Sequence, residues 1–147
     1  MIQFSGDFFV QHALTPGTIL YFHNDSIIHS PLPHYHVIVK VTDKEIVLLA
    51  STTSRLENKI RYIAVKKLPM STLVFINPDT DNGLTVESAV NCNEIFQYSK
   101  ENLKTLYTSG DLKIKGQLQE AYLEQIIQGL IDSPLIEKEI KIQIKGI

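Results

Sequence analysis

The segment HYHVIVKV, residues 34–41, decides the fold class of this chain. Side chains alternate between the two faces of a β-strand, and the β-branched residues of this segment favour one. The odd-numbered positions from Tyr35 to Val41 are therefore expected to face the core. His34 and His36 are two residues apart, so they are expected to project together from the opposite face.

The neighbouring segments predict that this strand belongs to an antiparallel sheet. A polar turn at 42–45 separates it from a continuous apolar run at 46–50, which is typical of a strand buried on both faces and predicts a hairpin. The segment 2–12 fits either a short helix or an irregular lead-in. Further strands are predicted from their β-branched and aromatic content at 18–23, 60–65, 71–76 and 88–98.

One helix is predicted near the end of the chain. Apolar residues recur at every fourth position from Leu118 to Leu130, and Pro134 limits the stripe. Within the tail, residues 132–147, isoleucines alternate with polar residues at 139–145, which predicts an added edge strand, with a frayed end as the alternative. Short strands followed by one amphipathic helix predict a mainly β, α+β fold: a small bent β-barrel with a C-terminal helix.

Composition places the 147 residues in one domain, 1–147, and restricts its function. The net charge of −2 gives no global electrostatic reason to expect nucleic acid or a membrane surface. The single cysteine, Cys92, excludes an intramolecular disulfide and is expected to be a buried core residue. No apolar run is long enough for a membrane span, so we expect a cytoplasmic protein that does not bind membranes.

Three stretches carry a family resemblance: PGTILYF at 16–22, IVLLASTTSR at 46–55 and LTVESAVNCNEIFQYSKENL at 84–103. Together they resemble the MazF/PemK family of ribosome-independent mRNA-cleaving toxins. Residues 110–130 are similar to the closing helix of that family, so the resemblance covers about 16–131. It implies an SH3-like barrel that forms a homodimer, binds single-stranded RNA in a groove and is held inactive by an antitoxin protein.

The resemblance also implies a chemistry that needs no metal or other cofactor. The RNA 2′-hydroxyl attacks the neighbouring phosphate and leaves a 2′,3′-cyclic phosphate, with an arginine and a Thr or Ser near the phosphorus. Thr53, or Ser54 beside it, matches the hydroxyl position. Members usually carry Arg-Pro before the apolar strand, but this chain has Tyr35-His36 there. The arginine is therefore absent from its usual place.

The two histidines of the central strand offer acid–base chemistry instead. Cleavage through a 2′-hydroxyl needs a base, an acid for the leaving oxygen and positive charge for the phosphate oxygens. Imidazoles titrate near pH ~6.5, so His34 and His36 suit the first two roles, with His36 replacing the arginine. The alternative is structural: His34 ends a loop, and His36 is a solvent-facing strand residue.

The polar turn at 51–55 suits phosphate binding, because it combines hydroxyls, backbone N–H groups and the guanidinium of Arg55. Lys59 and Arg61 are expected to flank it and follow an RNA backbone, and Tyr35 is a candidate for stacking on a base. The alternative is an ordinary polar turn followed by a solvated strand face.

Two other classes of function remain open. One is a non-catalytic barrel module that binds a protein or peptide partner, which the absent arginine favours. The other is a metalloenzyme centred on His34 and His36 with His29 or His23, because neutral imidazoles bind zinc and iron. No carboxylate stands at a recognisable ligand spacing, so no metal site is predicted.

Overall fold

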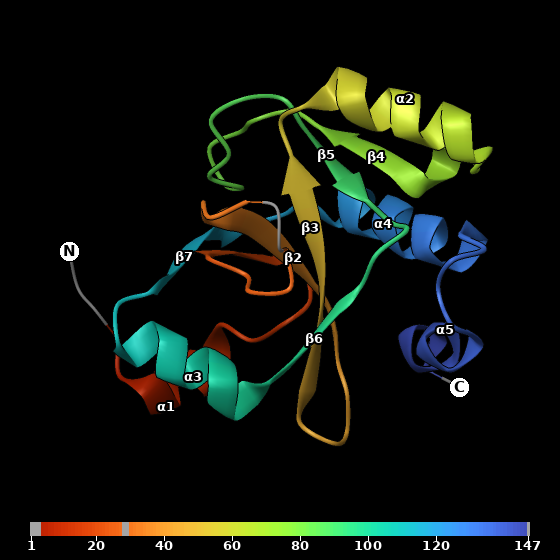
Figure 1. The fold of residues 1–147 in the computed structure, drawn as a ribbon. Coiled ribbons are helices and arrows are strands. Elements are labelled where there is room, and N and C mark those ends of the chain that lie inside the picture. Colours follow the sequence, from red (N-terminus) through yellow and green to blue (C-terminus); the bar gives the residue numbers. More distant parts are fainter. Residues whose placement is uncertain (1–3, 28–29, 147) are drawn as a thin grey trace.

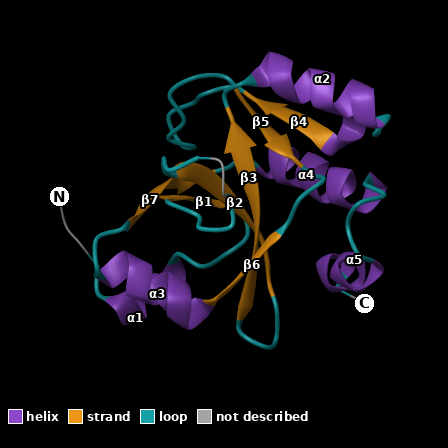
Figure 2. Cartoon of the chain, in the orientation of Figure 1, coloured by secondary structure: helices purple, strands orange, loops and turns teal. Residues whose placement is uncertain are grey.

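The computed structural model describes residues 4–27 and 30–146, which form an antiparallel α+β fold (Figures 1 and 2). Its strands are β1 Thr18–Phe22, β2 His34–Val41, β3 Ile46–Thr53, β4 Leu73–Ile76, β5 Ser88–Asn91, β6 Phe96–Ser99 and β7 Leu112–Gln117. Its helices are α1 Gly6–His12, α2 Leu56–Lys66, α3 Lys100–Thr108, α4 Glu120–Asp132 and α5 Lys138–Lys145, with a 3₁₀ turn at Met70–Thr72. The predicted α+β class is confirmed.

The seven strands form one sheet in the order β4-β5-β3-β2-β1-β7, with β6 also paired to β3. The predicted hairpin is confirmed, because Val37 of β2 pairs with Ala50 of β3. β3 is long enough to serve both halves of the sheet: its residues 46–49 pair with β6, and its last two residues pair with β5. β4 and β7 remain at opposite ends of the strand order, so the sheet bends without closing into a barrel.

Helices cover both faces of the sheet (Figure 1). One core lies under α1 and α3 and includes Phe9, Ile38 and Leu103, and the other lies under α4 and α5. The centre of β2 is therefore buried on both faces, and Ile38 is as inaccessible as Val37. The expectation that only the odd-numbered side of this strand faces the core is wrong, because α3 covers the other side.

The predicted strand at 60–65 is wrong, because these residues belong to α2. The prediction relied on the strand propensity of Ile60, Tyr62 and Val65. Leu56 and Ile63 are seven residues apart, which is two helical turns, and both pack on β4 and β5 in a small third core. Packing of this helical face outweighs the weak local preference.

The tail is also a helix rather than an edge strand. Ile136, Ile140 and Ile144 are spaced four residues apart and are all buried, whereas Ile142 is exposed. The isoleucines that alternate with polar residues thus also include positions with helical spacing. The helix α5, Lys138–Lys145, ends at Gly146, which has a left-handed backbone conformation.

The other expectations have mixed outcomes. α4 confirms the predicted amphipathic helix, and the segment 2–12 contains α1, which begins after the N-cap Ser5. The predicted strand 88–98 is two strands separated by a turn, and residues 112–117 within the supposed closing helix form β7. Cys92 is buried as expected, and burial raises the pKa of its thiol to about 12. None of the helices within 4–27 and 30–146 has the length and apolar character needed to cross a membrane.

Candidate active site

Three strand ends converge at one side of the sheet. β1 ends at Phe22, which pairs with His34 at the start of β2. β3 runs antiparallel to β2 and ends at Thr53 on the same side. His23 directly follows β1, and Arg55, two residues after the end of β3, is the N-cap of α2. Antiparallel pairing therefore collects an imidazole pair, hydroxyls and a guanidinium from three separate segments.

His34 is the half-buried group of this site. Its Nε2 atom is buried and, among the described residues, has no hydrogen-bond partner. Desolvation lowers the pKa of His34 from its ordinary 6.5, and the neighbouring charges of His23 and Arg55 lower it further. These charges act on His34 because the three groups lie near one another. At neutral pH the ring is therefore uncharged, which is the protonation state that a general base requires.

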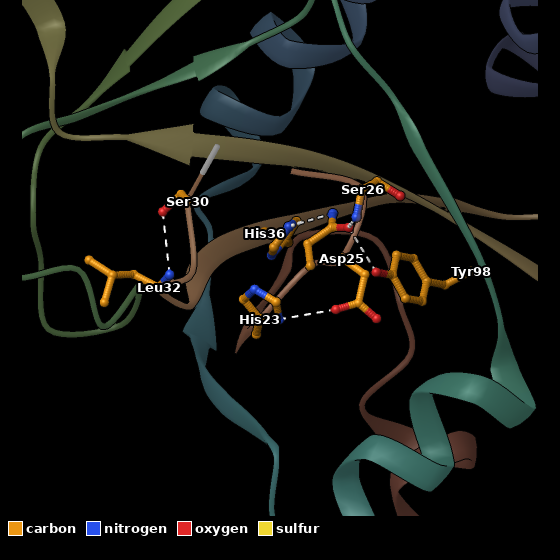
Figure 3. A network of polar contacts seen from close by, with 8 residues as sticks. His23, Asp25, Ser26, Ser30, Leu32, His36 and Tyr98 are labelled. Carbon is orange, nitrogen blue, oxygen red and sulfur yellow. Dashed lines mark hydrogen bonds and ion pairs between the residues drawn. The ribbon is translucent and has the colours of Figure 1, made fainter. Parts of the chain in front are cut away.

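His23 is paired with a carboxylate at the rim of the site. Its Nδ1 atom lies 3.1 Å from Oδ1 of Asp25, and the two side chains are 45% and 95% exposed (Figure 3). A ring that donates from Nδ1 to a carboxylate has a fixed orientation and leaves Nε2 for another partner. From the sequence, His23 is predicted only as a candidate metal ligand. The available signal was Asp25, two residues after His23 at the end of the predicted strand 18–23.

His36 occupies a different environment from His34, although both lie on the same side of β2. It is fully inaccessible to solvent, and its ring stacks on Phe22 with 4.3 Å between ring centres. Its Nδ1 atom donates to the carbonyl oxygen of His34 at 3.0 Å, and its Nε2 accepts from the side-chain amide of Asn24 at 3.1 Å. Asn24 in turn accepts from the Tyr98 hydroxyl at 2.8 Å (Figure 3).

This network makes His36 a core residue. Burial lowers its pKa to about 3, so the ring is neutral in the folded protein at ordinary pH. The expectation of a solvent-facing His36 is wrong, because β1 and β6 enclose the ring. The same enclosure leaves a substrate phosphate no access to it, so the geometry gives no support to His36 as the replacement for the arginine.

The hydroxyl-rich turn lies at the site as expected. Thr53 is half-buried and its Oγ1 accepts from the backbone N–H of Arg55 at 3.1 Å, which tightens the turn. Ser54 and Arg55 are exposed. Among the described residues, the guanidinium of Arg55 forms no ion pair, so it is available to an anion.

The remaining candidates are divided between the site and other surfaces. Lys59 is one helical turn after Arg55 in α2, and its ammonium lies 5.3 Å from the ring centre of Tyr62. Arg61 lies on another side of the helix, because six residues advance an α-helix by about one and two-thirds turns. Tyr35 faces the α4 side of the sheet, where its ring centre is 4.7 Å from that of Tyr21. The site thus contains Lys59 near its edge, but neither Tyr35 nor Arg61.

The part of the chain that the structure describes contains no group of three His, Cys, Asp or Glu side chains able to hold a metal ion. His29, which the metalloenzyme hypothesis used, lies outside the described residues.

The arrangement of strands and helices defines a MazF-like fold. The chain is similar to the solved structure of the Mycobacterium tuberculosis toxin MazF-mt6. The likeness covers 84% of this chain and 99% of the toxin chain, with a TM-score of 0.50. The two sequences are 15% identical, so the likeness establishes a shared fold. No family model matches this chain, and no curated protein matches it.

Proposed function

We propose that this protein is an endoribonuclease of the MazF type that cleaves single-stranded RNA without a metal ion. The observation that supports it is the convergence of His34, the His23–Asp25 pair and Arg55 at one end of the sheet. The MazF-like fold and the resembling sequence stretches support the same class. In this proposal it acts in the cytoplasm as a homodimeric toxin that an antitoxin protein inhibits.

Each residue of the site has a role in this reaction. His34 accepts the proton of the RNA 2′-hydroxyl, whose oxygen then bonds to the adjacent phosphorus. The bond from phosphorus to the 5′-oxygen breaks, and His23, oriented by Asp25, donates a proton to that oxygen. The products are a 2′,3′-cyclic phosphate and a free 5′-hydroxyl. Arg55 and the hydroxyls of the turn neutralise and hold the non-bridging phosphate oxygens.

Arg55 thereby supplies a guanidinium that the resembling family carries on a different segment. We expect Arg55→Ala to lower RNA cleavage by about 10²–10³-fold, because one charge-stabilising donor at a transition state has this effect. Expression of the wild-type protein in a bacterial host should arrest growth, and Arg55→Ala should relieve the arrest. Arg61→Ala is the matched control, because it removes the same charge from another side of α2. Equal toxicity of the two variants would contradict the assignment, and a harmless wild-type protein would contradict the proposal itself.

A second candidate function is a non-catalytic module that binds a protein or peptide. A groove of about 600 Å³ lies between α1 and β7. The rings of Phe4, Phe8 and His12 follow one another along its wall with 4.4 Å between successive ring centres, and Phe8 is 41% exposed. An exposed aromatic wall suits a partner chain. RNA that remains intact with purified protein, together with partner binding lost in Phe8→Ser, would favour this function.

A further inference from the structure

Helix α2 carries a line of cationic side chains that begins at the candidate active site. Arg55, Lys59 and Lys66 recur at intervals of about one and two helical turns, so they share one side of the helix, and Tyr62 lies between them. Arg55 and Lys66 are exposed, and Lys59 and Tyr62 are half-buried. We call these four residues the α2 stripe. It extends about 16 Å from the site at ~1.5 Å per residue.

Among the described residues, no carboxylate forms an ion pair with the α2 stripe. Glu57 is the one acidic residue in the helix sequence LENKIRYIAVK, and its position two residues after Arg55 directs it to another side. The ion pairs within the described residues are His23–Asp25, Lys100–Glu45 and Lys104–Asp7, none of which involves α2. Positive charge is thus concentrated here although the whole chain has a net charge of −2.

Packing explains Tyr62 but not the three cationic residues of the stripe. The buried face of α2 is formed by Leu56 and Ile63, which contact β4 and β5, and the half-buried Tyr62 packs against the same small core. Lys59 lies beside this face, with its ammonium 5.3 Å from the ring centre of Tyr62, and this contact directs the lysine along the helix toward Lys66. The Tyr62 ring is therefore partly exposed beside the row of charges.

We propose that the α2 stripe binds the RNA strand next to the scissile phosphate, so that the substrate-binding site extends along the helix. This inference rests on the proposed function and adds the part of the substrate that lies beyond the reacting bond. Lysines bind phosphates as mobile point charges, and contacts of this kind position a strand without reading its sequence. The tyrosine ring adds a surface on which a base can stack.

The inference is tested by the salt dependence of RNA binding. The probe is a fluorescent single-stranded oligonucleotide with 2′-O-methyl groups, which lacks the attacking hydroxyl and is not cut. The test variant is Lys59→Ala/Lys66→Ala. The control is Arg61→Ala/Lys67→Asn, which removes two charges from the same segment. Asparagine is chosen because Lys67 has a φ of +57°, a left-handed conformation that Asn tolerates.

We expect the test variant to bind at least about tenfold more weakly than the wild type at moderate salt. Each lost phosphate contact should also reduce the slope of log K against log salt by ~0.7, so that two contacts reduce it by ~1.4. The control should keep the wild-type slope, and thermal unfolding should show that both variants fold. Equal slopes in the two variants would contradict RNA binding by the α2 stripe without contradicting the proposed cleavage. A wild-type protein that neither binds nor cuts RNA would overturn both.

Discussion

His34→Ala is expected to lower the rate of RNA cleavage by about 10²–10⁴-fold, which is the contribution of a positioned general base. The loss should appear in kcat, because the imidazole acts on the proton transferred in the transition state. RNA binding should change little, since Arg55 and the α2 stripe remain. Single-turnover cleavage of a labelled RNA and binding of the uncleavable probe measure the two effects separately.

The pH profile identifies the role of His34 more specifically. A base must be unprotonated, so activity is lost as the pH falls through its pKa in the folded protein. Because burial and the charges of His23 and Arg55 lower that pKa, the acidic limb of the wild-type profile should lie below pH 6.5. Tyr35→Phe alters the adjacent residue on the opposite face and should leave the profile unchanged. Nearly wild-type activity in His34→Ala would exclude the assignment.

His36 is expected to make the folded protein strongly sensitive to acid. Its pKa is 6.5 when unfolded and about 3 when folded, because the buried ring cannot accept a charge. Between these values the unfolded chain binds one proton more than the folded chain, so the free energy of unfolding decreases as the pH falls. One such group contributes about 1.4 kcal/mol per pH unit, or roughly 3 kcal/mol between pH 6.5 and 4.

The matched variants are His36→Phe and His12→Gln. At neutral pH, His36→Phe should lower the free energy of unfolding by ~1–3 kcal/mol, because the amide of Asn24 and the carbonyl of His34 lose their partner. Its stability should nevertheless fall less steeply below pH 6.5 than that of the wild type. His12 is exposed, so His12→Gln should keep the wild-type slope. Urea unfolding between pH 4 and 7 measures this, and parallel slopes in wild type and His36→Phe would refute the explanation.

The strands were predictable where local pattern and tertiary packing agree. The alternating segment 34–41 and the apolar run 46–50 form the central hairpin, and the four-residue periodicity from Leu118 to Leu130 forms α4. The failures occurred where isoleucine-rich sequence fits two periodicities. Residues 56–66 and 138–145 carry β-branched residues that favour strands, but their buried positions repeat with helical spacing. Only the packing partner decides between these alternatives.

The residue types of the site could be predicted from the sequence, but not which of the candidate residues lie together in it. The sequence identified the pair His34 and His36, yet a strand pattern cannot show that Phe22 and Phe96 enclose one ring and leave the other beside Arg55. The two histidines were therefore interpreted as equivalent. The contribution of His23 depends on the pairing of β1 with β2, which brings a residue eleven positions away to the same strand ends.

Incubation of the purified protein with a single-stranded RNA in the presence of a metal chelator tests the central proposal most directly. We expect cleavage that the chelator does not affect, with a 2′,3′-cyclic phosphate on one product and a 5′-hydroxyl on the other. These ends follow from attack by the 2′-hydroxyl, with His34 as base and His23 as acid. RNA that stays intact, or that is cut only when a divalent metal is supplied, would contradict it.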